Sequence, residues 1–321
     1  MSRLKLTALV AGVLLLAGCG SGQYDATPLP GTTSSAPSGG STSAPSTPPT
    51  CANPLASYAP TGPNPAPGAM DAGTYMKTIQ DRRRLIAGVS ADTLLLGARN
   101  PVSDQIEGFD IDMLKLVSTA IFGTPDRIEF RVITAAQRIP ALTEGTVDIV
   151  ARNMTINCAR WEQIAFSAEY YRSGQKVLVP STSPAETLDD LAGKRVCAPN
   201  SSTSMDKLKQ FKKVIPVGAD THTGCLVMFQ QGKVDAITGD DTVLAGLAAQ
   251  DPYAKVTKAR FTEEPYGLGM SKQHPEFVRF VNKVLEQAKA DGQWKAAYNR
   301  WLAAALGPAP APPKPVYGRP E

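Results

Sequence analysis

A short pattern of helix, glycine and strand occurs twice in this chain and limits the folds that it can adopt. The two copies read Leu142-x-x-Gly145-x-Val147-Asp148-Ile149 and Phe229-x-x-Gly232-x-Val234-Asp235-Ala236. In each copy the glycine supplies the positive φ that ends a helix, and Val-Asp opens the next strand. The copies lie 87 residues apart, which predicts two similarly built α/β lobes.

The other patterns between residues 71 and 306 also alternate between strand and helix. A short apolar run at 84–89 and an alternating pattern at 127–133 indicate strands. Between them, a predicted helix ends at Gly123 and carries its apolar residues on one face: Ile111, Leu114, Val117 and Ile121. We therefore expect an α/β fold in which each lobe is a mixed or parallel sheet flanked by helices.

The order of these elements predicts how the chain divides between the lobes. The two last helices, at 275–292 and 293–306, have no third lobe to join and are expected to return to the first. Lobe 1 would then comprise 71–179 and 265–306, and lobe 2 would comprise 180–264, with crossings near 179–183 and 260–264. Because open parallel sheets bind ligands at the carboxyl ends of their strands, we expect a site in the cleft between the lobes, closed by a hinge.

The N-terminus has the features of an export signal. Arg3 and Lys5 precede an apolar run from Leu6 to Leu16 that is too short to span a bilayer comfortably, so residues 1–18 are predicted to be a signal peptide. The sequence Leu16-Ala17-Gly18-Cys19 resembles the lipobox of bacterial lipoproteins, which implies lipidation of Cys19, for example by palmitate, and anchoring to the outer face of the cell membrane. The alternative is an ordinary signal peptide with a chance cysteine.

Two segments of low complexity flank the predicted lobes. Residues 19–70 are dominated by Gly, Ser, Thr, Ala and Pro and offer almost nothing to bury, so we expect a disordered tether. Residues 307–321 form a shorter Pro-rich tail that we also expect to be extended.

The chain has five cysteines, and setting Cys19 aside leaves an even number in an exported protein. Four cysteines allow three pairings. Cys197 and Cys225 lie 28 residues apart in one predicted lobe, which favours a Cys197–Cys225 disulfide and leaves Cys51 to pair with Cys158. The alternatives are free thiols or a metal site, and no Cys/His spacing supports a metal.

Charge and motifs argue against other functional classes. The net charge is only +4 and no basic stripe is interleaved with aromatic residues, so nucleic-acid binding has little support. Neither of the two histidines lies near a GxSxG, HExxH or cysteine-nucleophile pattern. We therefore predict that the protein is not an enzyme, has no catalytic residues, metal or cofactor, and acts as a monomer.

Five segments in order resemble the signature blocks of the polar amino-acid solute-binding proteins of ABC importers (family 3): GFDIDMLKLV, LTEGTVDIVARNMTINCARWEQIAFSAEYY, LAGKRVCAPNSSTS, GKVDAITGDDTVLAGL and EEPYGLGMSK. The resemblance covers about 75 to 306. The lipobox, tether and extra cysteines are most similar to the glutamine/glutamate-binding lipoproteins of actinobacteria. The resemblance implies the two-lobed periplasmic-binding-protein fold of type II, with a polar amino acid in the cleft.

The resemblance also implies roles for particular residues. Arg160 matches the arginine that binds the ligand α-carboxylate through a bidentate fork, and Thr155 matches the threonine beside it. Asp240 matches the aspartate that binds the ammonium group, although Asp241 could compete for that role and Asp240 could instead be a helix N-cap. Ser202 and Thr203 match a turn whose amides and hydroxyls suit an anion, or they could be simple helix caps.

Further candidate ligand contacts are Ser90, after the first strand, and Asn153 and Arg152, before the Thr155 block. If Arg152 faces the cleft, it would favour a side-chain carboxylate over an amide; the alternative is a solvated surface arginine. Arg160, likewise, could pair at the surface with Glu162 or Glu169. Arg138 and Asp148 are predicted to be structural, and Tyr170 and Tyr171 belong either to the core or to the cleft rim.

These observations predict a membrane-anchored extracytoplasmic component of an ABC amino-acid importer. Its ligand would be glutamate or glutamine, with aspartate and asparagine also open, and its partner would be the membrane permease. A zwitterion that bridges Arg160 and Asp240 would stabilise the closed state, since only closure brings both charges to it. The alternative is a sensor lipoprotein that signals to a membrane partner, with the same binding chemistry.

Overall fold

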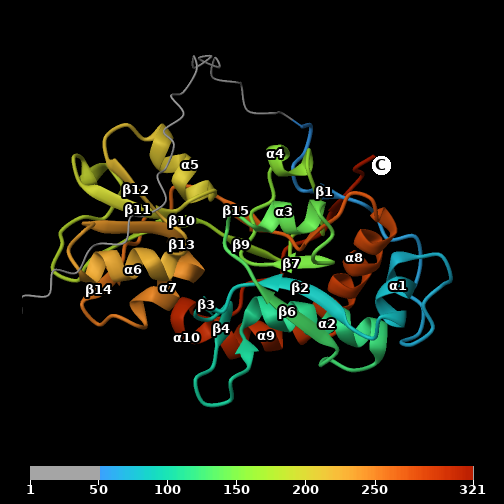
Figure 1. Ribbon diagram of the computed structural model, residues 1–321. Coiled ribbons are helices and arrows are strands. Elements are labelled where there is room, and N and C mark those ends of the chain that lie inside the picture. The colour runs from blue at the N-terminus through green and yellow to red at the C-terminus, as the bar shows by residue number, and fades with distance from the viewer. Residues whose placement is uncertain (1–50, 321) are drawn as a thin grey trace, which may run out of the picture. The chain divides into compact units, whose positions relative to one another are not determined.

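A computed structural model describes residues 51–320, which contain both predicted lobes (Figure 1). The predicted signal peptide, Cys19 and the tether up to residue 50 lie outside the described residues. Within 51–320, no helix is long and apolar enough to cross a membrane.

The first lobe is built on a five-stranded sheet with the strand order β6-β2-β7-β16-β8. These strands are β2 (Leu85–Val89), β6 (Ile128–Val132), β7 (Ile149–Ala151), β8 (Ala165–Phe166) and β16 (Gly269–Met270). β2 runs parallel to both of its neighbours, whereas β16 is antiparallel to β7 and β8. A small antiparallel sheet lies beside it: β3 (Asp92–Thr93), β4 (Gly97–Arg99) and β5 (Ile106–Glu107).

Three long helices pack together against this sheet and close the core of the first lobe (Figure 1). They are α2 (Phe109–Phe122), α8 (Pro275–Ala290) and α9 (Gln293–Trp301). The apolar face predicted for α2 is fully buried, and Gly123 ends that helix with a left-handed φ of 77°, as predicted. The shorter helices of this lobe are α1 (Tyr75–Asp81), α3 (Arg138–Thr143), α4 (Cys158–Trp161) and α10 (Ala303–Leu306).

The second lobe repeats the plan with a sheet in the order β12-β11-β13-β10-β14. Its strands are β10 (Gln175–Pro180), β11 (Arg195–Pro199), β12 (Ile215–Ala219), β13 (Ala236–Asp240) and β14 (Ala254–Val256). The helices around it are η1 (Asp189–Leu191), α5 (Thr203–Gln210), α6 (His222–Gln230) and α7 (Asp241–Ala248). β11, β12 and β13 run parallel, and β10 is antiparallel to its neighbours.

The repeated sequence pattern performs the same structural task in both lobes. Gly145 and Gly232 have φ values of 68° and 65° after their helices. The aspartate of each copy accepts a hydrogen bond from the backbone of a neighbouring strand. Asp148 accepts from the Ile86 N–H of β2 at 2.7 Å, and Asp235 accepts from the Arg195 N–H of β11 at 2.8 Å. These aspartates fix the strand that follows each helix, so the prediction that Asp148 is structural is confirmed.

The chain crosses between the two sheets earlier than the sequence predicted. The strand pair β9 (Tyr171–Ser173) and β15 (Glu264–Tyr266) joins the lobes, and β10 already belongs to the second sheet. The first crossing is therefore at Gly174, not near 179–183. A Cβ atom at Gly174 would lie 2.4 Å from the Thr262 carbonyl oxygen, so the close approach of the two crossing segments requires glycine there.

The prediction of a disordered tether up to residue 70 is wrong for residues 51–70. β1 (Ala56–Ser57) pairs in parallel with β17 (Val316–Tyr317) of the C-terminal tail, and Tyr58 and Met70 are buried in the first core. The composition of this segment is poor in apolar residues, but long-range contacts supply the stability that its own sequence lacks.

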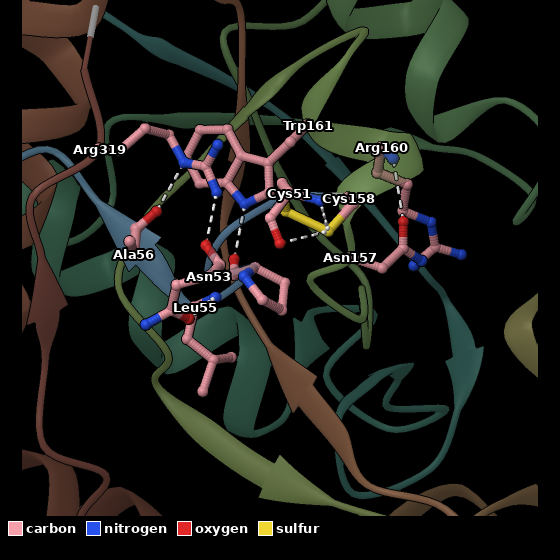
Figure 2. Close-up of a disulfide and its surroundings, with 10 residues drawn as sticks. Cys51, Asn53, Leu55, Ala56, Asn157, Cys158, Arg160, Trp161 and Arg319 are labelled. Atoms are coloured by element: carbon pink, nitrogen blue, oxygen red, sulfur yellow. Dashed lines mark hydrogen bonds between the residues drawn. A yellow bond between two sulfur atoms is a disulfide. The ribbon is translucent and has the colours of Figure 1, made fainter. Parts of the chain in front are cut away.

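One such contact is the disulfide between Cys51 and Cys158 (Figure 2). Beside it, Trp161 donates to the Pro54 carbonyl at 2.8 Å, and the guanidinium of Arg319 lies 3.8 Å from the centre of the Trp161 ring. The N-terminal segment and the C-terminal tail are thus fastened to α4. The second disulfide joins Cys197 to Cys225, so both predicted pairings are confirmed.

Candidate ligand-binding site

A small pocket lies between the two lobes, with a volume of about 10 Å³. Its lining comes from both of them: Ala135, Arg138, Arg152 and Asn153 from the first lobe, and Pro199, Ser202, Thr203, Ser204, His222 and Asp240 from the second. The lobes touch around it, since Arg138 donates to the Ser201 carbonyl at 3.3 Å and Thr223 donates to the Asp92 carbonyl at 2.9 Å. The structure is therefore a closed arrangement of the lobes, with room for about one water molecule.

Asp240 lies at the end of β13 with its side chain in this pocket. It occupies the N-cap position of α7, but its side chain makes no capping hydrogen bond, so the capping interpretation is wrong. Tyr266 donates to Oδ2 at 2.6 Å, whereas Oδ1 is buried and has no hydrogen-bond partner among residues 51–320. Burial, with the nearby charge of Glu264, raises the pKa of Asp240 to about 8.

Asp241, the alternative to Asp240, is already fully engaged. Its carboxylate accepts from Ser173 and from Arg260, both at 2.6 Å. These partners belong to the crossing segments between the lobes and not to the pocket. The carboxylate that is left for a ligand cation is therefore that of Asp240.

Arg160 is buried on α4, so a surface ion pair is excluded; Glu169 pairs instead with Arg172. The Asn157 side chain caps α4 by accepting from the Arg160 amide at 2.9 Å (Figure 2). The Arg160 guanidinium donates to the Thr155 carbonyl at 2.6 Å. Burial lowers its pKa, and the neighbouring charge of Glu264 opposes this effect. Arg160 lies next to the pocket lining and not within it.

Thr155 of the first lobe and Thr203 of the second both donate to the carboxylate of Glu264, a residue that the sequence analysis did not propose for the site. Glu264 Oε2 accepts from the Thr155 hydroxyl at 2.6 Å and from the Thr203 hydroxyl at 2.9 Å. Its Oε1 accepts from Gln175 at 2.6 Å and Thr262 at 2.8 Å. Glu264 lies in the EEPYGLGMSK block, but the sequence alone gave no reason to expect it between the lobes.

Ser202 is a helix cap, which was one of the two alternatives. Its hydroxyl donates to the Pro199 carbonyl at 2.6 Å and accepts from the Met205 amide at 3.1 Å. These bonds fix the first turn of α5, so Ser202 lines the pocket as part of a helix N-terminus.

Arg152 is buried and lines the pocket, so the interpretation as a solvated surface arginine is wrong. Its Nε donates to the Ile133 carbonyl at 2.8 Å. Asn153 also lines the pocket, and its backbone amide donates to Asp110 Oδ2 at 2.8 Å. Ser90 is not brought to the pocket, because its hydroxyl bonds to Asp92 and Thr93.

Arg138 links the lobes structurally, since its guanidinium donates to the carbonyls of Ala135, Arg152 and Ser201. The sequence analysis did not propose His222 for the site, yet its imidazole lines the pocket. No motif surrounds His222 that could have revealed it. Among residues 51–320 there is no cluster of three or more His, Cys, Asp or Glu suited to a metal ion.

The fold defines the class of protein. An ancestral arginine-binding protein bound to glutamine matches with a TM-score of 0.64 at 30% identity, over 69% of this chain and 98% of that one. A cysteine-binding protein from Campylobacter jejuni matches with a TM-score of 0.69 at 22% identity, over 73% of this chain and 95% of that one. The molecule has the two-lobed periplasmic-binding-protein fold of type II, as predicted.

The family follows from the sequence comparison. Residues 85–304 match the bacterial extracellular solute-binding proteins, family 3, and the chain belongs to this family. The glutamine-binding protein GlnH of the Bacillus subtilis ABC transporter is 31% identical over 71% of this chain and 84% of that protein. The glutamate-binding protein GluB of Corynebacterium glutamicum is 32% identical over 68% of this chain and 77% of that protein. These relatives are solute-binding proteins and not enzymes.

Proposed function

We propose that this protein binds a polar L-amino acid in the interlobe pocket, with glutamate and glutamine as the first candidates and aspartate and asparagine next. The observation that carries the proposal is the unpartnered, fully buried Oδ1 of Asp240. An unpartnered buried carboxylate oxygen is costly, and the α-ammonium group of an amino acid would satisfy it.

The cations of the first lobe support the same ligand. The guanidinium groups of Arg138, Arg152 and Arg160 are all buried at or beside the pocket. The pKa of Arg138 is well below its usual value because of burial and the charges of the other two. An incoming α-carboxylate offsets this mutual repulsion, and Arg160 is its proposed binding partner. The hydroxyls of Thr155 and Thr203, which donate to Glu264 in this closed arrangement, join Arg160 by exchanging Glu264 for the ligand carboxylate.

Binding requires movement of the lobes. A pocket of about 10 Å³ does not hold an amino acid, so the lobes must separate to admit it and then close around it. Because the cationic groups and Asp240 lie on opposite lobes, a zwitterion binds the closed state more tightly than the open one. The relatives named as glutamine- and glutamate-binding proteins support this choice of ligand.

We also propose that the loaded protein, as a monomer, delivers the amino acid to the permease of an ABC importer. The signal sequence and Cys19 support export and a lipid anchor on the outer face of the membrane. Incorporation of labelled palmitate that disappears in Cys19→Ala would support the anchor, and unchanged incorporation would contradict it.

Calorimetric titration of the purified full chain tests the binding function. Glutamine, glutamate, asparagine and aspartate are compared with N-acetylglutamine, which lacks the ammonium group. We expect saturable binding of at least one of the four amino acids and none of the acetylated control. Binding of none of the four, or equal binding of N-acetylglutamine, would contradict the proposal.

A further inference from the structure

The part of the pocket next to Arg152 contains a second unpartnered polar atom. His222 begins α6, its side chain lines the pocket, and it is 9% exposed. Its Nε2 is buried and has no hydrogen-bond partner among residues 51–320. This atom therefore has an unused hydrogen-bonding capacity at the edge of the pocket.

The surroundings of His222 indicate which nitrogen carries the proton. A hydrogen-bonding interaction with the Thr238 backbone raises the pKa of His222, so the imidazole is the donor in it. Since Nε2 has no partner, this bond belongs to Nδ1, which donates to the carbonyl oxygen and leaves a lone pair on Nε2. The ring also packs closely on Gly239, where a Cβ atom would lie 2.5 Å from Nε2. His222 is thus held in one orientation.

The charge of the ring is fixed as well. Burial, helped by the charge of Arg152, lowers the pKa of His222 to about 3. The imidazole is neutral at physiological pH, so its Nε2 is a hydrogen-bond acceptor and not a donor.

Arg152 provides the complementary donor. Its Nε is used by the Ile133 carbonyl, and within residues 51–320 no hydrogen bond engages its two terminal nitrogens. The carboxylates near the Arg152 guanidinium are those of Asp92 and Asp110, and the cation of Arg138 lies near it as well. Asp110 is occupied by Tyr170 and by the Asn153 amide, whereas Asp92 accepts from the Ser90 hydroxyl. A donor and an acceptor therefore stand together in one pocket.

We infer that Arg152 and His222 form a donor–acceptor pair that selects a side-chain carboxamide, so that the protein prefers glutamine or asparagine to the corresponding acid. This inference rests on the proposed function, since it assumes that the pocket binds an amino acid. It replaces the expectation, drawn from Arg152 alone, that a side-chain carboxylate is favoured.

A side-chain carboxamide and a side-chain carboxylate would interact differently with Arg152 and His222. A carboxamide oxygen accepts from Arg152 while its N–H donates to His222 Nε2, so both protein atoms are satisfied. A carboxylate would also attract Arg152, but it has no proton to give, and its charge would face the Nε2 lone pair and the nearby Asp92 carboxylate. A site whose buried polar atoms match one ligand rejects the analogue that leaves one of them unpaired.

The first test uses the unmodified full chain and compares glutamine, glutamate and glutamate γ-methyl ester by calorimetry, together with asparagine and aspartate. The side chain of the ester is neutral and keeps the carbonyl oxygen, but it has no N–H to donate. We expect glutamine or asparagine to bind at least about tenfold more tightly than its acid. If glutamine is the preferred amide, the ester should lose a similar factor.

The outcomes separate the two proposals. If an acid binds as tightly as its amide, or the ester as tightly as glutamine, the selection by His222 is wrong although the proposed function stands. If none of the amino acids binds, the proposed function fails, and this inference fails with it.

Variants test the role of His222 itself. In His222→Phe we expect the affinity for the amide to fall about tenfold while that for the acid changes little, so that the preference disappears. His222→Gln restores an acceptor oxygen and should retain part of the preference. The other histidine, His274, stacks on Tyr75 away from the pocket and provides a matched control in His274→Phe. Equal losses for amide and acid in His222→Phe, with an unchanged melting temperature, would overturn the inference.

Discussion

The hydroxyl of Thr155 donates a 2.6 Å hydrogen bond to the carboxylate of Glu264, 109 residues further along the chain. The same oxygen accepts from Thr203 on the other lobe. Thr155 and Thr203 match residues that bind the ligand carboxylate in the family, but in this closed arrangement they bind the carboxylate of Glu264. Glu264 joins both lobes at the strand pair that connects them.

Replacing Glu264 by Gln should destabilise the protein. In the variant, an amide nitrogen replaces one of the two carboxylate oxygens, so the donors that bind that oxygen lose their acceptor. We expect the free energy of unfolding to fall by roughly 1–3 kcal/mol. Denaturant unfolding of Glu264→Gln measures this change. Glu263→Gln is the matched control because its side chain is 60% exposed. Equal stability of both variants and the unmodified protein would show that the Glu264 cluster contributes nothing.

Ligand affinity should depend on the ionisation of Asp240. Because its pKa is raised to about 8 without ligand, the ammonium group can bind only after Asp240 loses its proton. Affinity should therefore rise up to about tenfold per pH unit below pH 8 and level off above it. Titration in buffers of different ionisation enthalpy measures the released proton. Asp240→Asn should bind more weakly and without this pH dependence, and an affinity of the unmodified protein that is constant between pH 6 and 8 would contradict the prediction.

The same pKa shift predicts how stability without ligand changes with pH. A pKa raised from 3.8 to about 8 favours the protonated folded state, so the contribution of Asp240 is complete below pH 4 and is lost as pH rises to about 8. At pH 8, Asp240→Asn should therefore be more stable than the unmodified protein by roughly 1–3 kcal/mol. Thermal unfolding at pH 4 and pH 8 compares them, and a less stable Asn variant at pH 8 would contradict this sign.

Arg160→Met should weaken ligand binding by roughly 10- to 150-fold while the protein still folds. The substitution removes the proposed contact with the α-carboxylate, and a hydrogen bond to a charged group contributes about 1.5–3 kcal/mol. Calorimetry measures the loss, and circular dichroism checks the fold. Arg172→Met is the control, since Arg172 is half-exposed and pairs with Glu169. Normal binding by Arg160→Met would remove Arg160 from the site.

The two disulfides should contribute to stability more than to affinity. Replacing Cys197 and Cys225 by Ser opens a 28-residue link, and replacing Cys51 and Cys158 opens one of 107 residues. The chain-entropy model predicts a loss of about 3–5 kcal/mol for each pair. Thermal unfolding with and without reductant measures it. An unchanged melting temperature on reduction would contradict the prediction.

Local patterns in the sequence were sufficient to predict the class of fold. The repeated glycines at 145 and 232, the apolar face of α2 and the even number of cysteines besides Cys19 each depend on neighbouring residues or on simple spacing. Such signals survive without tertiary information because backbone conformation and helical periodicity are local properties. The ordered sequence blocks likewise indicated the family before any geometry was known.

The order of residues 51–70 and the roles of Glu264 and His222 depended on contacts between residues that are distant in the sequence. Residues 51–70 have the composition of a disordered segment, yet a disulfide and pairing with the C-terminal tail order them. Glu264 and His222 carry no recognisable motif, and their chemistry comes from the atoms that they meet across the pocket and the hinge. The sequence by itself determined the two α/β lobes and most of the candidate residues. Only the tertiary structure decided which polar atoms are buried and unpartnered, because burial and hydrogen bonding arise when separate parts of the chain pack together.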